Sequence, residues 1–125
     1  MNILGVIPAR YGSTRLPGKP LADICGKPLI QHVYEQASRA SLIGALIVAT
    51  DDERIVEAVQ AFNGNAVLTG ADHPNGTSRV AEVARNMNVD LVINIQGDEP
   101  LLDPQMIDEV AGALMEDETV VSATL

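Results

Sequence analysis

The chain has 125 residues, of which 46% are hydrophobic and 20% are charged, a balance typical of one globular domain with a sizeable core. Its net charge of −9 argues against a general nucleic-acid-binding protein, and no apolar run approaches the ~20 residues that span a membrane. The single cysteine, Cys25, excludes an internal disulfide and predicts a protein of the reducing cytoplasm.

The first half of the chain predicts two strand–helix units. An apolar strand at residues 2–7 leads through a loop to an amphipathic helix at residues 28–37. The continuous apolar run 45–49 is typical of a strand buried on both faces. Residues 50–53 have the pattern of a capping box, with Thr50 first and Glu53 last, and predict a second helix. The expected buried face of that helix carries Ile55, Val56 and Val59.

The second half continues the alternation. Asp103 and Pro104 suit the N-cap and first position of a helix that ends near residue 115. The other expected elements are strands at 66–69, 91–95 and from 119 onward, and a helix at 77–87. This alternation predicts an α/β fold with a parallel, doubly wound sheet, formed by residues 1–125 as one unit. Because the last strand pattern has no polar tail, we expect the chain to be the first part of something longer.

The loop after the first strand concentrates positive charge. Residues 1–27 hold four of the eight cationic side chains and one acid, whereas the other 98 residues hold sixteen acids. The loop also contains Gly12 and Gly18, and glycine-containing loops after buried strands often present backbone N–H groups to phosphates. The spacing fits neither a Walker A motif nor Gly-x-Gly-x-x-Gly. We therefore expect a small anionic ligand, the alternative being a solvated basic loop.

Other polar residues follow the remaining strands, where parallel sheets bind ligands. Asp98 follows a strand and a glycine and is the candidate Mg²⁺ ligand; the alternative is that it only caps a turn. Asp51 is expected to be structural rather than catalytic. Thr77 fits a helix N-cap, whereas Arg79 in the first turn opposes the helix dipole, which indicates a purpose other than helix stability.

Four ordered segments together resemble the 3-deoxy-manno-octulosonate (Kdo) cytidylyltransferase family. These segments are residues 7–21, 48–52, 73–79 and 94–100. The resemblance implies a Rossmann-like nucleotidyltransferase fold of the nucleotide-diphospho-sugar transferase type, incomplete at its C-terminal end. It also implies a cytoplasmic enzyme that uses CTP and Mg²⁺ to form CMP-Kdo and pyrophosphate for lipopolysaccharide biosynthesis, and that is a homodimer at full length.

The resemblance also implies roles for individual residues. Arg10, Lys19 and Asp98 match catalytic positions, with Asp98 as the Mg²⁺ ligand. The nucleotide would be bound by Pro8, Ala9, Arg10, Gly12, Ser13, Lys19, His73, Gly76 and Thr77. The sugar acid would be bound by Arg15, Arg79 and Gln96.

Two alternatives remain open at this point. The chain could belong to a cytidylyltransferase for another sugar acid, such as amino-Kdo or a sialic acid. It could also be a truncated, non-catalytic nucleotide-binding module, because the resembling family is about twice as long and completes its metal site and sugar pocket in its second half. The chain alone is expected to bind CTP weakly and to turn over negligibly.

Overall fold

Strand β1 (Ile3–Ala9) is the central strand of a five-stranded parallel sheet in the computed structural model. The structure describes residues 3–12, 18–70, 76–85, 87, 89–97, 103–116 and 122–124. The strand order is β5-β4-β1-β6-β7, with β4 (Ala45–Thr50), β5 (Ala66–Leu68), β6 (Leu91–Asn94) and β7 (Ser122–Thr124). Since β1 has a strand on each side and helices on both faces, nearly all of its residues are buried.

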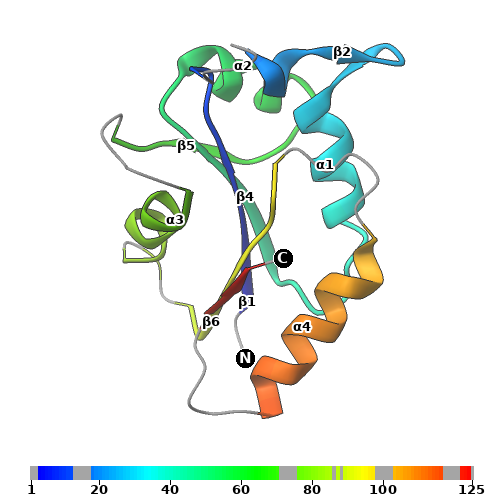
Figure 1. Cartoon of the computed structure of the whole chain (residues 1–125), viewed down its shortest axis with the longest axis vertical. Coiled ribbons are helices and arrows are strands. Elements are labelled where there is room, and N and C mark those ends of the chain that lie inside the picture. The colour runs from blue at the N-terminus through cyan, green and yellow to red at the C-terminus, as the bar shows by residue number, and fades with distance from the viewer. Residues whose placement is uncertain are drawn as a thin grey trace.

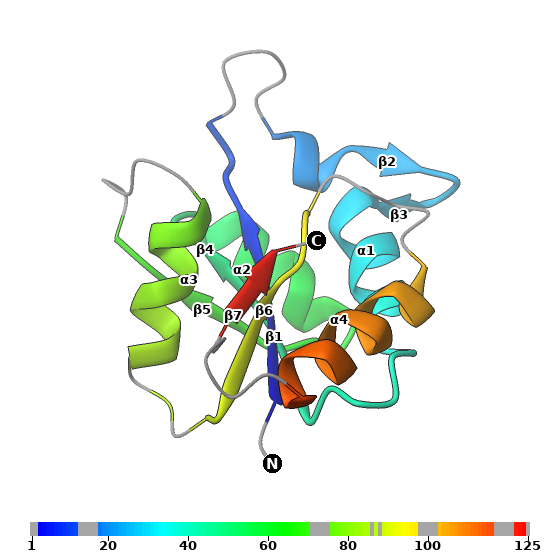
Figure 2. The same ribbon diagram turned by 60° about the horizontal axis from the view of Figure 1, so that its bottom comes forward.

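Helices cover both faces of this sheet (Figures 1 and 2). Three of them, α1 (Leu29–Ala37), α2 (Glu53–Ala61) and α4 (Pro104–Glu116), contribute to the core on one face. Helix α3 (Gly76–Arg85) packs Val80 and Val83 against the other face. The arrangement confirms the predicted doubly wound α/β fold. No helix in the described part of the chain has the length and apolar character of a membrane-spanning segment.

A short 3-10 helix, η1 (Lys19–Leu21), and a hairpin of β2 (Asp23–Ile24) and β3 (Lys27–Pro28) precede α1 and were not predicted. Two-residue strands are too short to show an alternating pattern. The turn between them places Cys25 at φ 54° and Gly26 at φ 85°, and positive φ at both positions suits a two-residue hairpin loop.

The predicted capping box at residues 50–53 was wrong. Strand β4 extends through Thr50, so the helix starts later and its N-cap is Asp52, whose carboxylate accepts a hydrogen bond from the Arg54 N–H at 2.8 Å. Thr50 is fully buried, and its hydroxyl accepts a hydrogen bond from the Asp52 N–H instead. On the predicted buried face of α2, Ile55 and Val59 are buried, while Val56 is only half-buried.

Candidate functional site

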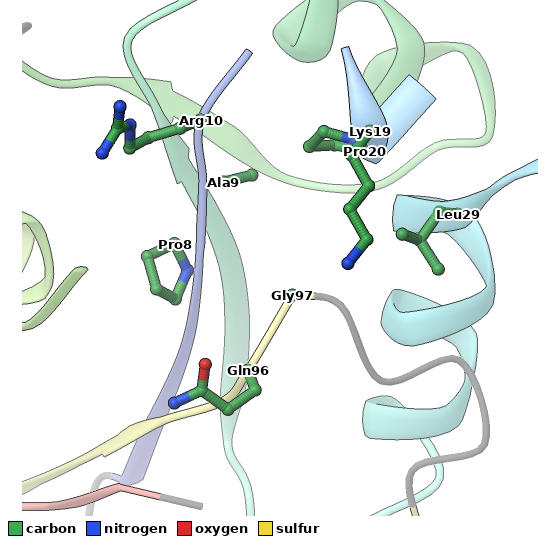
Figure 3. A pocket seen from close by; sticks show the side chains of 8 residues that line it. All are labelled: Pro8, Ala9, Arg10, Lys19, Pro20, Leu29, Gln96 and Gly97. Carbon is green, nitrogen blue, oxygen red and sulfur yellow. The ribbon is translucent and has the colours of Figure 1, made fainter. Parts of the chain in front are cut away.

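A cavity of about 240 Å³ opens where the carboxyl ends of β1 and β6 meet (Figure 3). The chain adds β4 and β5 on one side of β1 and then returns to add β6 on the other side, so this position is a topological switch point. Open parallel sheets bind ligands in the crevice at such points. The lining residues are Pro8, Ala9, Arg10, Lys19, Pro20, Leu29, Gln96 and Gly97.

Gly97 keeps the two strand ends close enough to form this cavity. A Cβ atom at this position would lie 2.9 Å from the Pro8 carbonyl oxygen and 3.3 Å from the Ile7 Cγ2 atom. Just before it, the Ile95 N–H donates to the Val6 carbonyl at 2.8 Å, so the backbones still run together beyond the last paired residue of β6. The backbone of β1 and the segment that follows β6 therefore lie side by side at the cavity.

Lys19 brings a positive charge to the cavity from η1. Gly18, at φ 75°, is the residue that precedes η1, and it turns the chain so that Lys19 faces the strands. In Figure 3 the Lys19 side chain extends from η1 toward Gly97. This placement puts the Lys19 ammonium at the cavity, and its contact with a phosphate stays a prediction.

Arg10, in contrast, does not point at Lys19. Figure 3 shows its side chain on the opposite side of β1, and its guanidinium donates to the Gly12 carbonyl at 2.7 Å. The two cations predicted to act together are thus brought to the same cavity margin by their backbones but are not directed at one point. Gln96 extends along the β6 side, with its amide toward Pro8 (Figure 3).

Arg79 lies away from the cavity, within the protein. Helix α3 packs on the face of the sheet that α1, α2 and α4 do not cover, and it brings Arg79 to the ends of β4 and β5. The Arg79 side chain is therefore only 1% exposed. The guanidinium donates to the Thr69 hydroxyl at 2.5 Å and to the Gly70 carbonyl at 3.1 Å, and lies 3.9 Å from the Asp51 carboxylate. The predicted contact of Arg79 with the sugar acid therefore has no support in this geometry.

Four of the predicted site residues lie outside the described residues: Ser13, Arg15, His73 and Asp98. Gly76 and Thr77 form the start of α3, so the helix begins one residue before the predicted cap. Within the described ranges, no three His, Cys, Asp or Glu side chains are grouped to hold a metal ion.

Sequence reasoning did not include three of the lining residues. Pro20 lies in the family-resembling segment 7–21 but is given no role of its own there, and Leu29 is predicted only as part of the buried face of a helix. Gly97 was noted only as a neighbour of Asp98. Its position directly after a buried strand, with no room for a side chain, is the signal that could have identified it.

Comparisons with known proteins agree with this geometry. A family model described as cytidylyltransferase matches residues 4–125. The 3-deoxy-manno-octulosonate cytidylyltransferases of Geobacter metallireducens and Geotalea uraniireducens are 54% and 56% identical to the chain over all 125 residues. The match covers 49% and 50% of those two proteins, so the chain spans about half the length of the curated relatives it matches.

Solved structures give the same result. The structure of a CMP:2-keto-3-deoxy-manno-octonic acid synthetase complexed with CTP has a TM-score of 0.91 and 50% identity, over 94% of this chain and 48% of that one. A cytidylyltransferase from Leptospira borgpetersenii serovar Hardjo-bovis, at 23% identity, has a TM-score of 0.83 over 94% of this chain and 50% of that one, and so shares the fold. These likenesses confirm the predicted nucleotidyltransferase-type fold.

Proposed function

This chain belongs to the cytidylyltransferase family, and from that membership we propose that it is the nucleotide-binding part of an enzyme that activates Kdo with CTP, releasing CMP-Kdo and pyrophosphate. The observation that carries the proposal is the cavity at the switch point, which has Lys19 on one wall and the bare backbone of Gly97 on the other. The choice of Kdo and CTP rests on the relatives, one of which was solved in complex with CTP.

The proposed reaction is a transfer of the cytidylyl group. The anomeric hydroxyl of the sugar acid attacks the α-phosphorus of CTP and loses its proton to water. The bond from that phosphorus to the oxygen bridging the α- and β-phosphates breaks, and pyrophosphate leaves with the electron pair of that bond. Such transfers depend on positioning and charge neutralisation. Lys19 would offset charge on the triphosphate and on the leaving pyrophosphate, and Arg10 would do so after turning from the Gly12 carbonyl.

We propose Mg²⁺ as the cofactor and Asp98 as its ligand from this chain. Asp98 directly follows Gly97, which lines the cavity, and a carboxylate beside bound phosphates is the ligand set that Mg²⁺ prefers. Bound there, the ion would neutralise phosphate charge. The proposal for the whole protein also includes a homodimer and a cytoplasmic location, with which the exposed, unpaired Cys25 thiol is compatible.

CTP binding by the chain tests the core of this proposal. Isothermal titration with Mg²⁺ and each of the four nucleoside triphosphates should show a preference for CTP. Lys19→Gln should weaken CTP binding by about tenfold to one-hundredfold, as expected for loss of a hydrogen bond between charged groups. Lys27→Gln is the matched control, because Lys27 is an exposed lysine that pairs with Glu35 outside the cavity.

Pyrophosphate release with Kdo then separates two functions. Release that requires CTP and Kdo and is lost in Asp98→Ala would show that this part of the enzyme is catalytic by itself. Binding without release would mark the chain as a nucleotide-binding module that needs further residues, which is the outcome expected for half of a longer enzyme. Equal effects of Lys19→Gln and Lys27→Gln on CTP binding would refute the proposed site.

A further inference from the structure

The loop that carries the two cations is closed at its base by a backbone hydrogen bond. The Gly18 N–H donates to the Tyr11 carbonyl at 2.6 Å, which joins the two ends of the segment between them. Arg10 directly precedes Tyr11, and Lys19 directly follows Gly18. The spacing of the two cationic residues therefore depends on this closed pair, which we call the loop neck (Tyr11 and Gly18).

Within the loop neck, the Tyr11 ring packs against Gly18. A Cβ atom on Gly18 would lie 3.1 Å from the Tyr11 Cε2 atom, so the ring fills the space beside a glycine in the left-handed region. Tyr11 is half-buried and packs against the main hydrophobic core. The Tyr11 ring is thus in contact with both the hydrophobic core and Gly18.

Arg54, from the first turn of α2, stacks on the same ring. Its Cζ atom lies 3.4 Å from the Tyr11 ring centroid, well within the range of a cation–π contact. The planar guanidinium is held in this orientation by Asp52, to which its Nε and Nη2 atoms donate at 3.0 and 2.7 Å. Such a two-pronged bond fixes the plane of an arginine, whereas a lysine would make only a point contact.

Asp52 is well suited to fix this arginine. Its carboxylate also caps α2, accepting the Arg54 N–H at 2.8 Å, and its side chain is only 19% exposed. The Arg54 side chain is 58% exposed, and an exposed ion pair that points to solvent contributes little to stability. The Arg54 guanidinium instead lies over the Tyr11 ring, which contacts Gly18.

We propose that Arg54 is a positioning residue for the triphosphate: through the Tyr11 ring it holds the loop neck in the shape that keeps Arg10 and Lys19 at the spacing the phosphates require. This inference rests on the proposed function, since it assumes that the loop binds the triphosphate. Arg54 lies outside the cavity lining, so the proposed action is indirect.

The test compares CTP with CMP binding in Arg54→Met, which removes the charge and the plane but keeps an apolar stem. CTP affinity should fall by about two- to fivefold, the range of one exposed cation–π contact, while CMP affinity changes less because CMP lacks the β- and γ-phosphates. Arg39→Met is the matched control, because Arg39 is exposed and bonds only to Gln36 among the contacts that the structure describes.

A double-mutant cycle identifies the ring as the intermediary. Tyr11→Phe, which keeps the ring, should retain CTP affinity, whereas Tyr11→Leu should lose it about as much as Arg54→Met. The double variant Tyr11→Leu/Arg54→Met should be no weaker than Tyr11→Leu alone. Amide exchange at Gly18 should be faster in Arg54→Met than in wild type, and this readout needs no ligand and separates an opened neck from general unfolding.

The outcomes also distinguish the two proposals. A wild-type chain that binds no nucleoside triphosphate would overturn the proposed function and with it the positioning role. Wild-type CTP binding that is unchanged in Arg54→Met, that falls equally for CTP and CMP, or that falls additively with Tyr11→Leu would overturn only the positioning role.

Discussion

An aspartate lies near each end of strand β4, and comparing the two separates a contact that holds the fold from one that serves the site. At the amino end, Asp108 of α4 accepts hydrogen bonds from the N–H groups of Ser41 and Leu42, at 3.1 and 2.8 Å, and from the Ser41 hydroxyl at 3.0 Å. At the carboxyl end, Asp52 bonds to Arg54, two residues away.

The separation in sequence explains why the two aspartates differ. Asp108 joins segments more than 60 residues apart, so it anchors α4 to the connection that leads into β4 and restricts the chain over that distance. Asp52 acts within one helical turn, and its long-range effect passes through Arg54 to the Tyr11 ring. We therefore expect changes at the amino end to reduce stability and changes at the carboxyl end to reduce nucleotide affinity.

Replacing Asp108 should give the largest loss of stability. Asp108→Ala removes the acceptor of three hydrogen bonds and should lower the free energy of unfolding by about 2–3 kcal/mol in urea denaturation. The CTP affinity of the folded fraction should remain that of wild type. Glu109→Ala, at the neighbouring exposed position, should stay within about 0.5 kcal/mol of wild type. A parallel fall in CTP affinity for Asp108→Ala would break the separation between the two ends.

Gly97→Ala should affect both properties, because it acts where the fold and the cavity share one backbone. The added methyl group would lie 2.9 Å from the Pro8 carbonyl and force the two strand ends apart, at a cost of about 1–2 kcal/mol. CTP binding should weaken together with stability. Gly112→Ala is the control, since nothing lies within 4 Å of its Cβ position and alanine in a helix should raise stability by about 0.5–1 kcal/mol. Unchanged CTP binding in Gly97→Ala would place the nucleotide elsewhere.

Much of the fold was predictable because its central strands are buried on both faces. The apolar runs at β4 and β6 could be recognised without knowing their neighbours, and Asp103 was correctly predicted to cap α4, accepting the Gln105 N–H at 2.9 Å. The capping box after β4 failed because two consecutive aspartates and a threonine offer several N-cap positions. Only the length of the strand, set by pairing with β1, decides among them.

Less of the candidate site could be predicted, because side-chain direction depends on tertiary contacts. The loop motif predicted that Arg10 and Lys19 lie at one site, and both line the cavity. The motif could not show that the Arg10 side chain turns toward the Gly12 carbonyl. The unfavourable position of Arg79 in the first turn of α3 predicted a purpose other than helix stability, and the structure shows its guanidinium buried and bonded to Thr69 and Gly70. No local pattern in the sequence shows which face of the sheet α3 covers. That face decides whether Arg79 contacts a ligand or makes a buried bond to Thr69.

The smallest effect expected, and the sharpest for the comparison, comes from Asp52→Asn. Asparagine caps helices as well as aspartate does, so α2 should persist, while the charged two-pronged bond to Arg54 is lost. CTP affinity should fall by no more than the two- to fivefold loss expected for Arg54→Met. Asp103→Asn makes the same change at the N-cap of α4, where Gln105 replaces the arginine, and should leave CTP affinity unchanged.

The pH dependence gives this substitution a second readout. The hydrogen bond from Arg54 holds the pKa of Asp52 below its ordinary value of 3.8, so the folded protein releases this proton more readily than the unfolded chain does. The contribution of Asp52 to stability is therefore complete above pH 3.8 and is lost as the pH falls through the lower folded value. Asp52→Asn should flatten the acid limb of the stability profile slightly.

The pKa of Asp108 is also held below its ordinary value. Burial alone would raise that pKa, but the hydrogen bonds from Leu42 and Ser41 together lower it by more. An acid limb that is flattened by Asp108→Asn but unaltered by Asp52→Asn would show that the Asp52–Arg54 pair is not formed in solution. Nothing would then hold the Arg54 guanidinium over the Tyr11 ring, and the proposed difference between the two ends of β4 would be lost.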